Sequence, residues 1–91
     1  MLRITRSSQF KKDVKRVRDK KILLDALQET INRLAQQQPL PERYQDHALI
    51  GGEYAGYRDC HVRPDLVLIY RLVGSEELYL LRVGSHSELR L

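Results

Sequence analysis

The first half of the chain has the hydrophobic spacing of two helices. Residues 2–5 can form a short first strand, and Ser7 or Ser8 can cap a helix by accepting a bond from an unpaired N–H of its first turn. In this helix lysines and arginines separate the apolar residues Phe10, Val14 and Val17. A second helix is expected to begin near Lys21 and to be ended by Pro39 and Pro41. Its apolar stripe is Leu24, Leu27, Ile31 and Leu34.

The second half changes to the spacing of β-strands. Three short strands are predicted at residues 56–62, 66–73 and 78–83, with turns at Pro64 and at Gly74–Ser75. Residues 42–55 fit neither period, so we expect them to form a long loop, which in a small domain is often functional. The order β-α-α-β-β-β predicts an α+β fold, with a helical hairpin on one face of a small, mainly antiparallel sheet.

Strand alternation assigns side chains to the two faces of this sheet. Successive side chains point to opposite faces, so Tyr57, Asp59 and His61 are expected to share a face, opposite Arg58, Cys60 and Val62. In the last strand Leu78, Leu80 and Arg82 are expected opposite Tyr79, Leu81 and Val83. The helices cover one face, and the other is expected to remain open, with room for a site.

Length and composition indicate one soluble domain over residues 1–91. Hydrophobic residues make up 42% of the 91 positions and charged residues 31%, which is ordinary for a globular protein. No apolar run is long enough to span a bilayer, and the N-terminus lacks the apolar region of a signal peptide, so a cytoplasmic location is expected. The lone Cys60 cannot form an internal disulfide or a structural zinc site by itself, which argues against redox chemistry and cysteine-based metal binding.

The positive charge is concentrated at the start of the chain. The whole chain carries +4, whereas residues 1–21 hold nine basic and two acidic residues. Such a cluster is either a solvated helix face or a surface that attracts polyanions, and its clustering favours nucleic acid. The candidate RNA- or ribosome-binding residues are Lys11, Lys12, Lys15, Arg16 and Arg18.

Residues that can transfer protons lie outside the helices. If the strands form consecutive hairpins, His61 and Asp65 flank one turn, and His86 follows a strand that returns to the same edge. His47 in the loop and Arg82 can join them. Histidine exchanges protons near neutral pH. Each residue also has a plainer interpretation, as a surface histidine, a turn aspartate or an arginine paired with a nearby glutamate. A zinc site formed by the three histidines is less favoured, because their spacing is not that of a metal motif.

Three stretches of the sequence resemble YafQ-like toxins of the RelE/ParE superfamily: YQDHAL at 44–49, GYRDCHVRPDLVLIYRL at 56–72 and RVGSHSEL at 82–89. The resemblance covers nearly the whole chain. It implies a RelE-like fold and a toxin of a type II toxin–antitoxin pair that enters the ribosomal A site, cleaves mRNA and inhibits translation. The implied partners are a cognate antitoxin, the 70S ribosome and mRNA. Carried over by position, the catalytic residues are His47, His61, Asp65, Arg82 and His86.

The implied reaction uses the 2′-OH of the RNA as nucleophile and needs neither a metal nor a cofactor. His86 and Asp65 are the expected proton-transfer pair, and Arg82 the phosphate clamp. Leu66 and Arg90 stand where such toxins often carry aromatic residues, which leaves the base preference open. Because few rings remain to grip free RNA, cleavage is expected to depend on the ribosome.

Two rival functions fit the same fold. ParE-like toxins share the architecture but inhibit DNA gyrase and lack the histidine cluster. A non-catalytic nucleic-acid-binding module would use the basic helices alone.

Overall fold

The computed structural model describes residues 1–91 and has the predicted order of elements with three additions. The elements are β1 (Arg3–Arg6), α1 (Ser8–Val17), α2 (Lys21–Ala35), the 3₁₀ turn η1 (Glu42–Tyr44), β2 (His47–Ala48), β3 (Arg58–Arg63), β4 (Leu66–Val73), β5 (Glu77–Gly84) and α3 (His86–Leu89). Of the two serines predicted as possible caps, Ser7 is the N-cap of α1. Its Oγ accepts a bond from the Phe10 amide at 2.9 Å.

The strands form one sheet in the order β1-β5-β4-β3-β2. Strand β1 pairs with β5 in parallel, and every other neighbouring pair is antiparallel, which confirms a mainly antiparallel sheet. The expected loop at 42–55 is partly ordered instead, since it contains η1 and the short edge strand β2. Strand β2 has only two residues, which is too short to produce an alternating pattern, so the sequence did not predict it.

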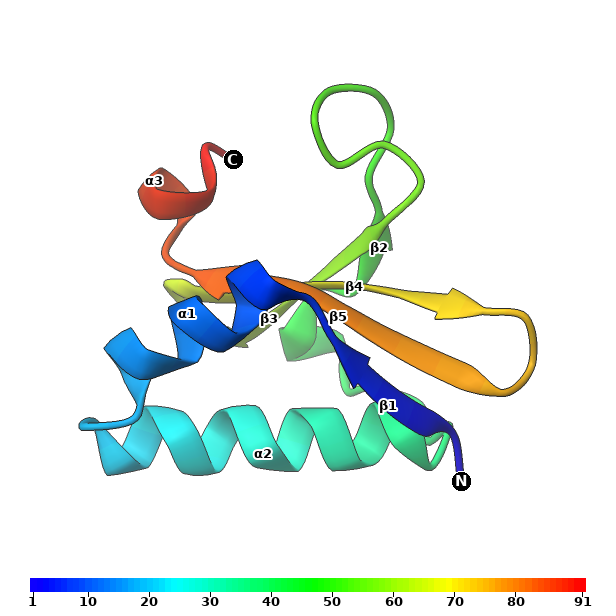
Figure 1. The fold of residues 1–91 in the computed structure, drawn as a ribbon, viewed down its shortest axis with the longest axis horizontal. Helices are drawn as coiled ribbons and strands as arrows, with labels where there is room; N and C mark the ends of the chain where they lie inside the picture. Colours follow the sequence, from blue (N-terminus) through cyan, green and yellow to red (C-terminus); the bar gives the residue numbers. More distant parts are fainter.

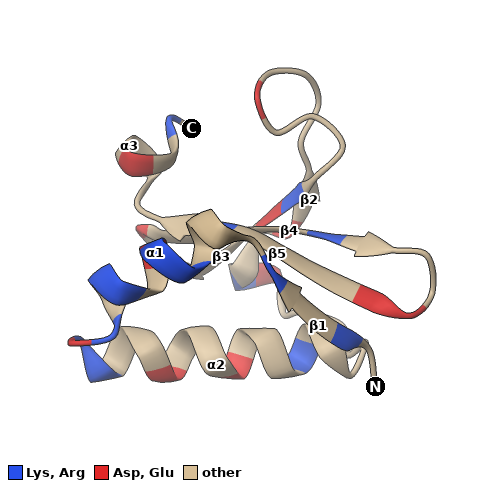
Figure 2. Ribbon diagram, viewed as in Figure 1, with Lys and Arg blue, Asp and Glu red and all other residues tan.

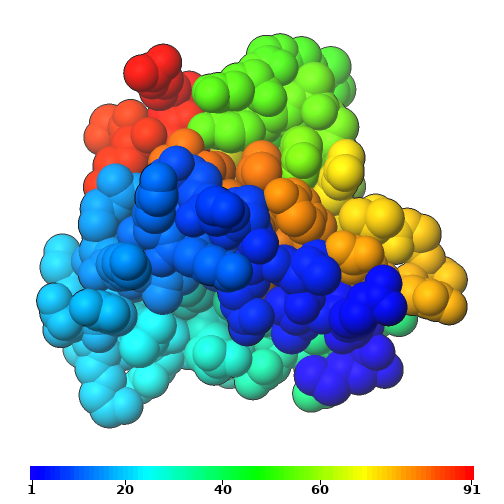
Figure 3. Space-filling view, in the orientation of Figure 1, coloured from blue at the N-terminus to red at the C-terminus, as the bar shows by residue number.

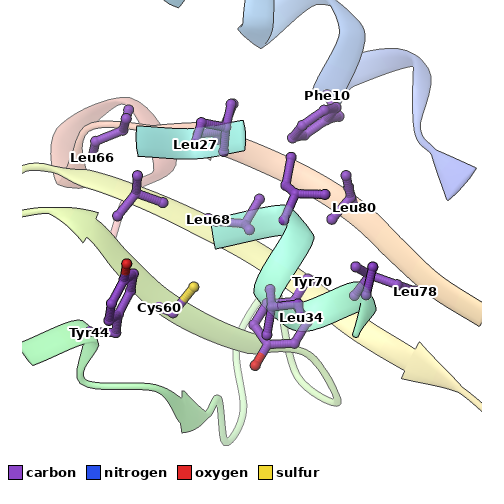
Figure 4. Close-up of a cluster of buried hydrophobic side chains, with 14 of the residues drawn as sticks. Phe10, Leu27, Leu34, Tyr44, Cys60, Leu66, Leu68, Tyr70, Leu78 and Leu80 are labelled. Atoms are coloured by element: carbon purple, nitrogen blue, oxygen red, sulfur yellow. The ribbon is translucent and has the colours of Figure 1, made fainter. Parts of the chain in front are cut away.

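The main core lies between the helices and one face of the sheet. Helix α2 lies under the sheet and α1 packs beside β5 (Figure 1). Phe10 and Leu27 from the helices meet Leu68, Leu78 and Leu80 from the central strands (Figure 4). On α2, Leu23 rather than Leu24 packs against this core, together with Leu27, Ile31 and Leu34. The helical hairpin is therefore confirmed on one face of the sheet.

A bulge in β5 corrects the predicted faces of that strand. Ile69 pairs with Arg82 but Tyr70 pairs with Leu80, so Leu81 is the extra residue on β5. Val83 consequently lies in the helix-side core with Leu78 and Leu80, and Arg82 does not. The prediction that Arg82 shares their face was wrong, because strict alternation assumes a ladder without an extra residue.

The opposite face of the sheet is partly covered. Val67 and Ile69 from β4 are fully buried there under Tyr54 and Leu89. The segment 49–57 and α3 rise from this face on the side away from α2 (Figure 1), and they stand close together in the space-filling view (Figure 3). The face expected to be open is thus partly closed, because Tyr54 and Leu89 from these two segments cover the aliphatic residues of β4. No helix is long and apolar enough to cross a membrane.

Candidate active site

His61, Asp65 and His86 meet at one end of the sheet. Asp65 lies in the turn between β3 and β4, and His86 is the first residue of α3, two residues after β5. His61 pairs with Val67, which pairs with Gly84, so three adjacent strands bring these segments together. The His61 and His86 rings meet edge to face with centroids 5.0 Å apart. The structure therefore brings together three of the five predicted catalytic residues.

Asp65 fixes the orientation of His86. Its Oδ1 accepts the His86 backbone N–H at 3.0 Å and lies 2.8 Å from His86 Nδ1. The backbone hydrogen bond, reinforced by the side-chain bond, lowers the pKa of Asp65, so its carboxylate is ionised and can only accept. Nδ1 must then carry the hydrogen, which leaves Nε2 of the ring free to take a proton from a substrate.

The short helix α3 holds His86 in this position. Ser85 caps it: its Oγ accepts the Glu88 amide at 3.1 Å, while Glu88 Oε1 accepts the Ser85 amide at 2.8 Å. The bond from the Ser85 amide lowers the pKa of Glu88, so the Glu88 carboxylate stays ionised and continues to accept this bond. The side chain of His86 remains 41% exposed, so substrate can reach its free nitrogen.

His47 lies on β2 beside Asp59 rather than in a loop. Its Nδ1 lies 2.7 Å from the Gln45 carbonyl oxygen and 3.2 Å from Asp59 Oδ1. Asp46 steadies this edge, because its Oδ1 accepts bonds from Tyr70 at 2.7 Å and from Arg58 at 3.3 Å. His47 is thus one strand and two residues away from His61, at the margin of the site.

Asp59 is a site residue that sequence reasoning missed. Strand alternation placed it on the correct face, but only the structure shows that it is 4% exposed and that its Oδ1 accepts no hydrogen bond. Burial raises the pKa of this carboxyl, and the nearby His47, His61 and His86 act in the opposite direction. A buried carboxyl group with one oxygen lacking a hydrogen bond, beside three imidazoles, is an arrangement typical of functional sites.

Arg82 lies across the floor of the site and is held by Asp13 of α1. Its Nε and Nη2 donate to Asp13 at 2.7 and 3.2 Å, and these bonds raise the pKa of the guanidinium. Asp13 is fully buried and also accepts the Val83 amide at 3.1 Å and a bond from Arg16. The predicted alternative, a pair with a nearby glutamate, was wrong in its partner: an aspartate of the basic helix fills the role.

The cross-strand register places these groups around one surface. His47, Asp59, Ile69 and Arg82 form a single row across four strands, and His61, Val67 and Gly84 form the next row. Adjacent strands are about 4.8 Å apart, so Arg82 stands roughly 10 Å from Asp59 with Ile69 between them. A phosphate bound on this face, where Tyr54 and Leu89 cover Val67 and Ile69, would have imidazoles on one side and a guanidinium on the other.

Basic residues flank this surface. All five predicted binding residues on α1 and after it are exposed, and the positive bands of α1 group on one side of the molecule (Figure 2). A hollow of about 410 Å³ that includes Arg16, Lys20 and Asp65 joins this helix to the histidine end. On the other side, Arg43 and Arg63 line a hollow of about 450 Å³ together with His61. The sequence pattern did not single out these two arginines. No group of three or more His, Cys, Asp or Glu side chains is arranged to hold a metal ion.

Comparison with known proteins agrees with this architecture. The family model for YafQ, a bacterial toxin of type II toxin–antitoxin systems, matches residues 2–91. A YafQ toxin of Haemophilus influenzae is 43% identical over 96 residues, covering 99% of this chain and 93% of that protein. The mRNA interferase toxin YafQ of Escherichia coli K12 is 39% identical over 84 residues, covering 91% and 89%.

The likeness extends to three dimensions. The crystal structure of the E. coli DinJ–YafQ complex contains a chain that matches with a TM-score of 0.83 at 38% identity, covering 98% of both chains. The family resemblance of the three sequence stretches and the α+β fold are therefore confirmed. The chain belongs to the YafQ family of bacterial toxins of type II toxin–antitoxin systems.

Proposed function

We propose that this toxin is an endoribonuclease that cleaves mRNA in the ribosomal A site and so inhibits translation. The observation that carries the proposal is the Asp65-oriented His86 facing His61, with Arg82 across the same face of the sheet. The name of the E. coli relative, an mRNA interferase toxin, supports the same substrate. A ParE-like gyrase inhibitor would have no use for this arrangement of proton-transfer groups.

The free Nε2 of His86 takes the proton of the RNA 2′-OH, whose oxygen then attacks the adjacent phosphorus. Arg82 and a protonated His47 stabilise the charge that develops on the phosphate oxygens. The bond from phosphorus to the 5′ oxygen breaks, and His61 as imidazolium donates a proton to that oxygen. The products are a 2′,3′-cyclic phosphate and a free 5′-OH, and the base and acid are restored by proton exchange with water.

These steps are complete with the chain's own groups. Asp65 orients the base instead of moving a proton itself, which refines its expected role. His47 takes its charge beside Asp59, where the imidazolium would form an ion pair at 3.2 Å. No step requires a metal ion, and catalysis is therefore proposed to be metal-independent.

The partners follow from charge. The exposed basic residues of α1 are proposed to contact ribosomal RNA phosphates, and the toxin is accordingly proposed to act in the cytoplasm. A cognate antitoxin is the second partner, as DinJ is found with YafQ in the E. coli complex. An acidic antitoxin segment would cover the positive surface and gain association rate from it.

A cell-free translation assay tests the proposal. The purified toxin should arrest translation and leave cut mRNA, and His86→Gln should reduce cutting about 10²–10⁴-fold. Ser87→Ala, on the exposed side of the same short helix, is the matched control and should cut at the wild-type rate. Arrest with intact mRNA would overturn the proposal, and broken DNA in a parallel gyrase reaction would indicate the ParE-like function instead.

A further inference from the structure

Arg71 lies against two tyrosine rings on the catalytic face of the sheet. Its guanidinium carbon is 5.0 Å from the ring centroid of Tyr57 and 5.8 Å from that of Tyr79. The two rings are 6.5 Å apart and tilted by 46°. Few rings were expected to be available for RNA. Tyr79 is one of them, because it alternates with the core residues Leu78 and Leu80 and so lies on the opposite face, as the strand pattern predicted.

Arg71 forms no close ion pair with a carboxylate, although its charge contributes to the lowered pKa of Glu77, after the bonds from Thr5 and Arg3. Arg3, Arg16, Arg33, Arg58 and Arg82 each form an ion pair with an acidic side chain. Glu77, the acidic neighbour of Arg71, accepts its hydrogen bonds from Thr5 at 2.6 Å and from Arg3 at 3.4 Å. Arg71 is exposed and its aromatic contacts restrict the guanidinium without neutralising it, so it is prepared for an anion.

This trio is continuous with the proposed active site. A groove of about 420 Å³ is lined by Gln9, Glu53, Tyr54, Tyr57, Leu81 and Arg82. The groove therefore connects Arg82, the proposed phosphate-binding residue, with Tyr57 of the trio. Arg71 is four residues along β4 from Val67, about 13 Å for an extended strand, which a few nucleotides of single-stranded RNA can span.

We propose that Tyr57, Arg71 and Tyr79 form a subsite for the substrate RNA strand on one side of the cleaved phosphate. A base enters the groove and stacks on the Tyr57 ring, and Arg71 binds the phosphate that follows it. This inference rests on the proposed endoribonuclease function and adds a place where the strand is held outside the reacting atoms. A nucleotide can use both groups, because its base can stack on the aromatic ring and its phosphate can bind the guanidinium. An acidic protein segment would bind the guanidinium but has no base to occupy the groove.

The test uses the toxin with programmed ribosomes and with short RNAs. Arg71→Gln removes the exposed charge, Tyr57→Leu removes a ring, and Tyr57→Phe keeps the ring. Arg33→Gln, on the far side of the sheet on α2, is the matched control for the loss of one arginine charge. Apparent KM and kcat for cleavage are measured, together with binding of RNA oligonucleotides to a His86→Gln background, using RNAs shortened stepwise from either end.

Arg71→Gln and Tyr57→Leu should each raise KM about tenfold with little change in kcat, and Tyr57→Phe and Arg33→Gln should behave like the parent protein. The effect of Arg71→Gln should disappear on RNAs too short to reach the trio from one end. Unchanged KM and RNA binding in Arg71→Gln, while the wild type cleaves mRNA, would overturn the subsite but not the endoribonuclease. Equal loss of binding to ribosomes without message, or loss of antitoxin binding alone, would also overturn it. Absence of cleavage by the wild type would instead defeat the proposed function.

Discussion

Arg82 and Asp13 hold each other between the last strand and the first helix, with Arg82 Nε 2.7 Å and Val83 N 3.1 Å from the same Asp13 oxygen. The carboxylate is fully buried and the arginine side chain is 20% exposed. One contact therefore fixes α1 on β5, stabilises the bulged strand, and aims the guanidinium at the catalytic face. Two arginines share this carboxylate, so the group retains a net positive charge for phosphate.

We predict that Asp13→Ala is strongly destabilising. Removing one partner of a buried pair leaves the other charge and the Val83 amide uncompensated, at a cost of about 3–5 kcal/mol. Urea denaturation measures the change. Asp25→Ala, which breaks the exposed Lys21–Asp25 pair, is the control and should change the unfolding free energy by less than about 1 kcal/mol. Equal effects of the two substitutions would show that Asp13 is an ordinary surface partner.

Asp65→Asn should lower the cleavage rate about 10–100-fold without unfolding the protein, because the His86 ring loses its ionised orienting acceptor. The lowered pKa of Asp65 also has a pH consequence. Its contribution to stability is present above the unfolded pKa of about 3.9 and is lost as the pH falls through the lower folded value. Carbon-13 NMR of the Asp65 carboxyl should show a midpoint below that of an unfolded aspartate; a midpoint above it would contradict the pairing.

Asp59 should behave in the opposite way. Because burial raises its pKa, the stability associated with this group is present below about pH 3.9 and is lost as the pH rises through the folded value. Asp59→Asn should therefore raise the unfolding free energy at pH 7, by about 1 kcal/mol, and have a smaller effect near pH 4. Cleavage should fall as His47 loses its charge partner. A variant less stable at pH 7 than at pH 4, relative to the parent, would show that the ionised carboxylate is well accommodated.

The sequence predicted the parts of this molecule that repeat and missed those that interrupt a pattern. The spacing of Phe10 and Val17 was sufficient for α1, and three later strands followed from alternation and turns. The extra residue at Leu81 was not visible, because a bulge changes pairing without changing composition. Asp13 seemed to be one acidic residue on a basic face, and its role depends on burial beneath a distant strand. Asp59 was placed on the correct face, but its chemistry depends on the absence of a hydrogen-bond donor.

The basic residues of α1 should determine the salt dependence of ribosome binding. Each phosphate contact adds about 0.7–0.9 to the slope of log affinity against log salt concentration. Replacing Lys11, Lys12 and Lys15 by Gln should reduce the slope by about 2, whereas Arg33→Gln on α2 should leave it unchanged. Binding to purified ribosomes at several salt concentrations measures this slope. If the triple variant keeps the parent's slope, these lysines are only a solvated helix face.

Cleavage should depend strongly on the ribosome. Val67 and Ile69 lie beneath the proposed site and are covered by Tyr54, which is only 8% exposed and so offers little ring surface for stacking, and Leu66 and Arg90 supply no ring beside His86. The other two tyrosines on this side, Tyr57 and Tyr79, lie near Arg71, away from the reacting end. In-line attack needs the 2′-OH, the phosphorus and the leaving oxygen held in alignment, which is worth about 7–11 kcal/mol in well-oriented systems. A ribosome that holds the codon can supply this alignment, while the toxin supplies proton transfer and positive charge.

Incubating one mRNA with the toxin, with and without translating ribosomes, should give cuts at codon boundaries on translated message and far slower cutting of naked RNA. Equal rates and identical cut sites in the two reactions would identify a free-standing ribonuclease instead.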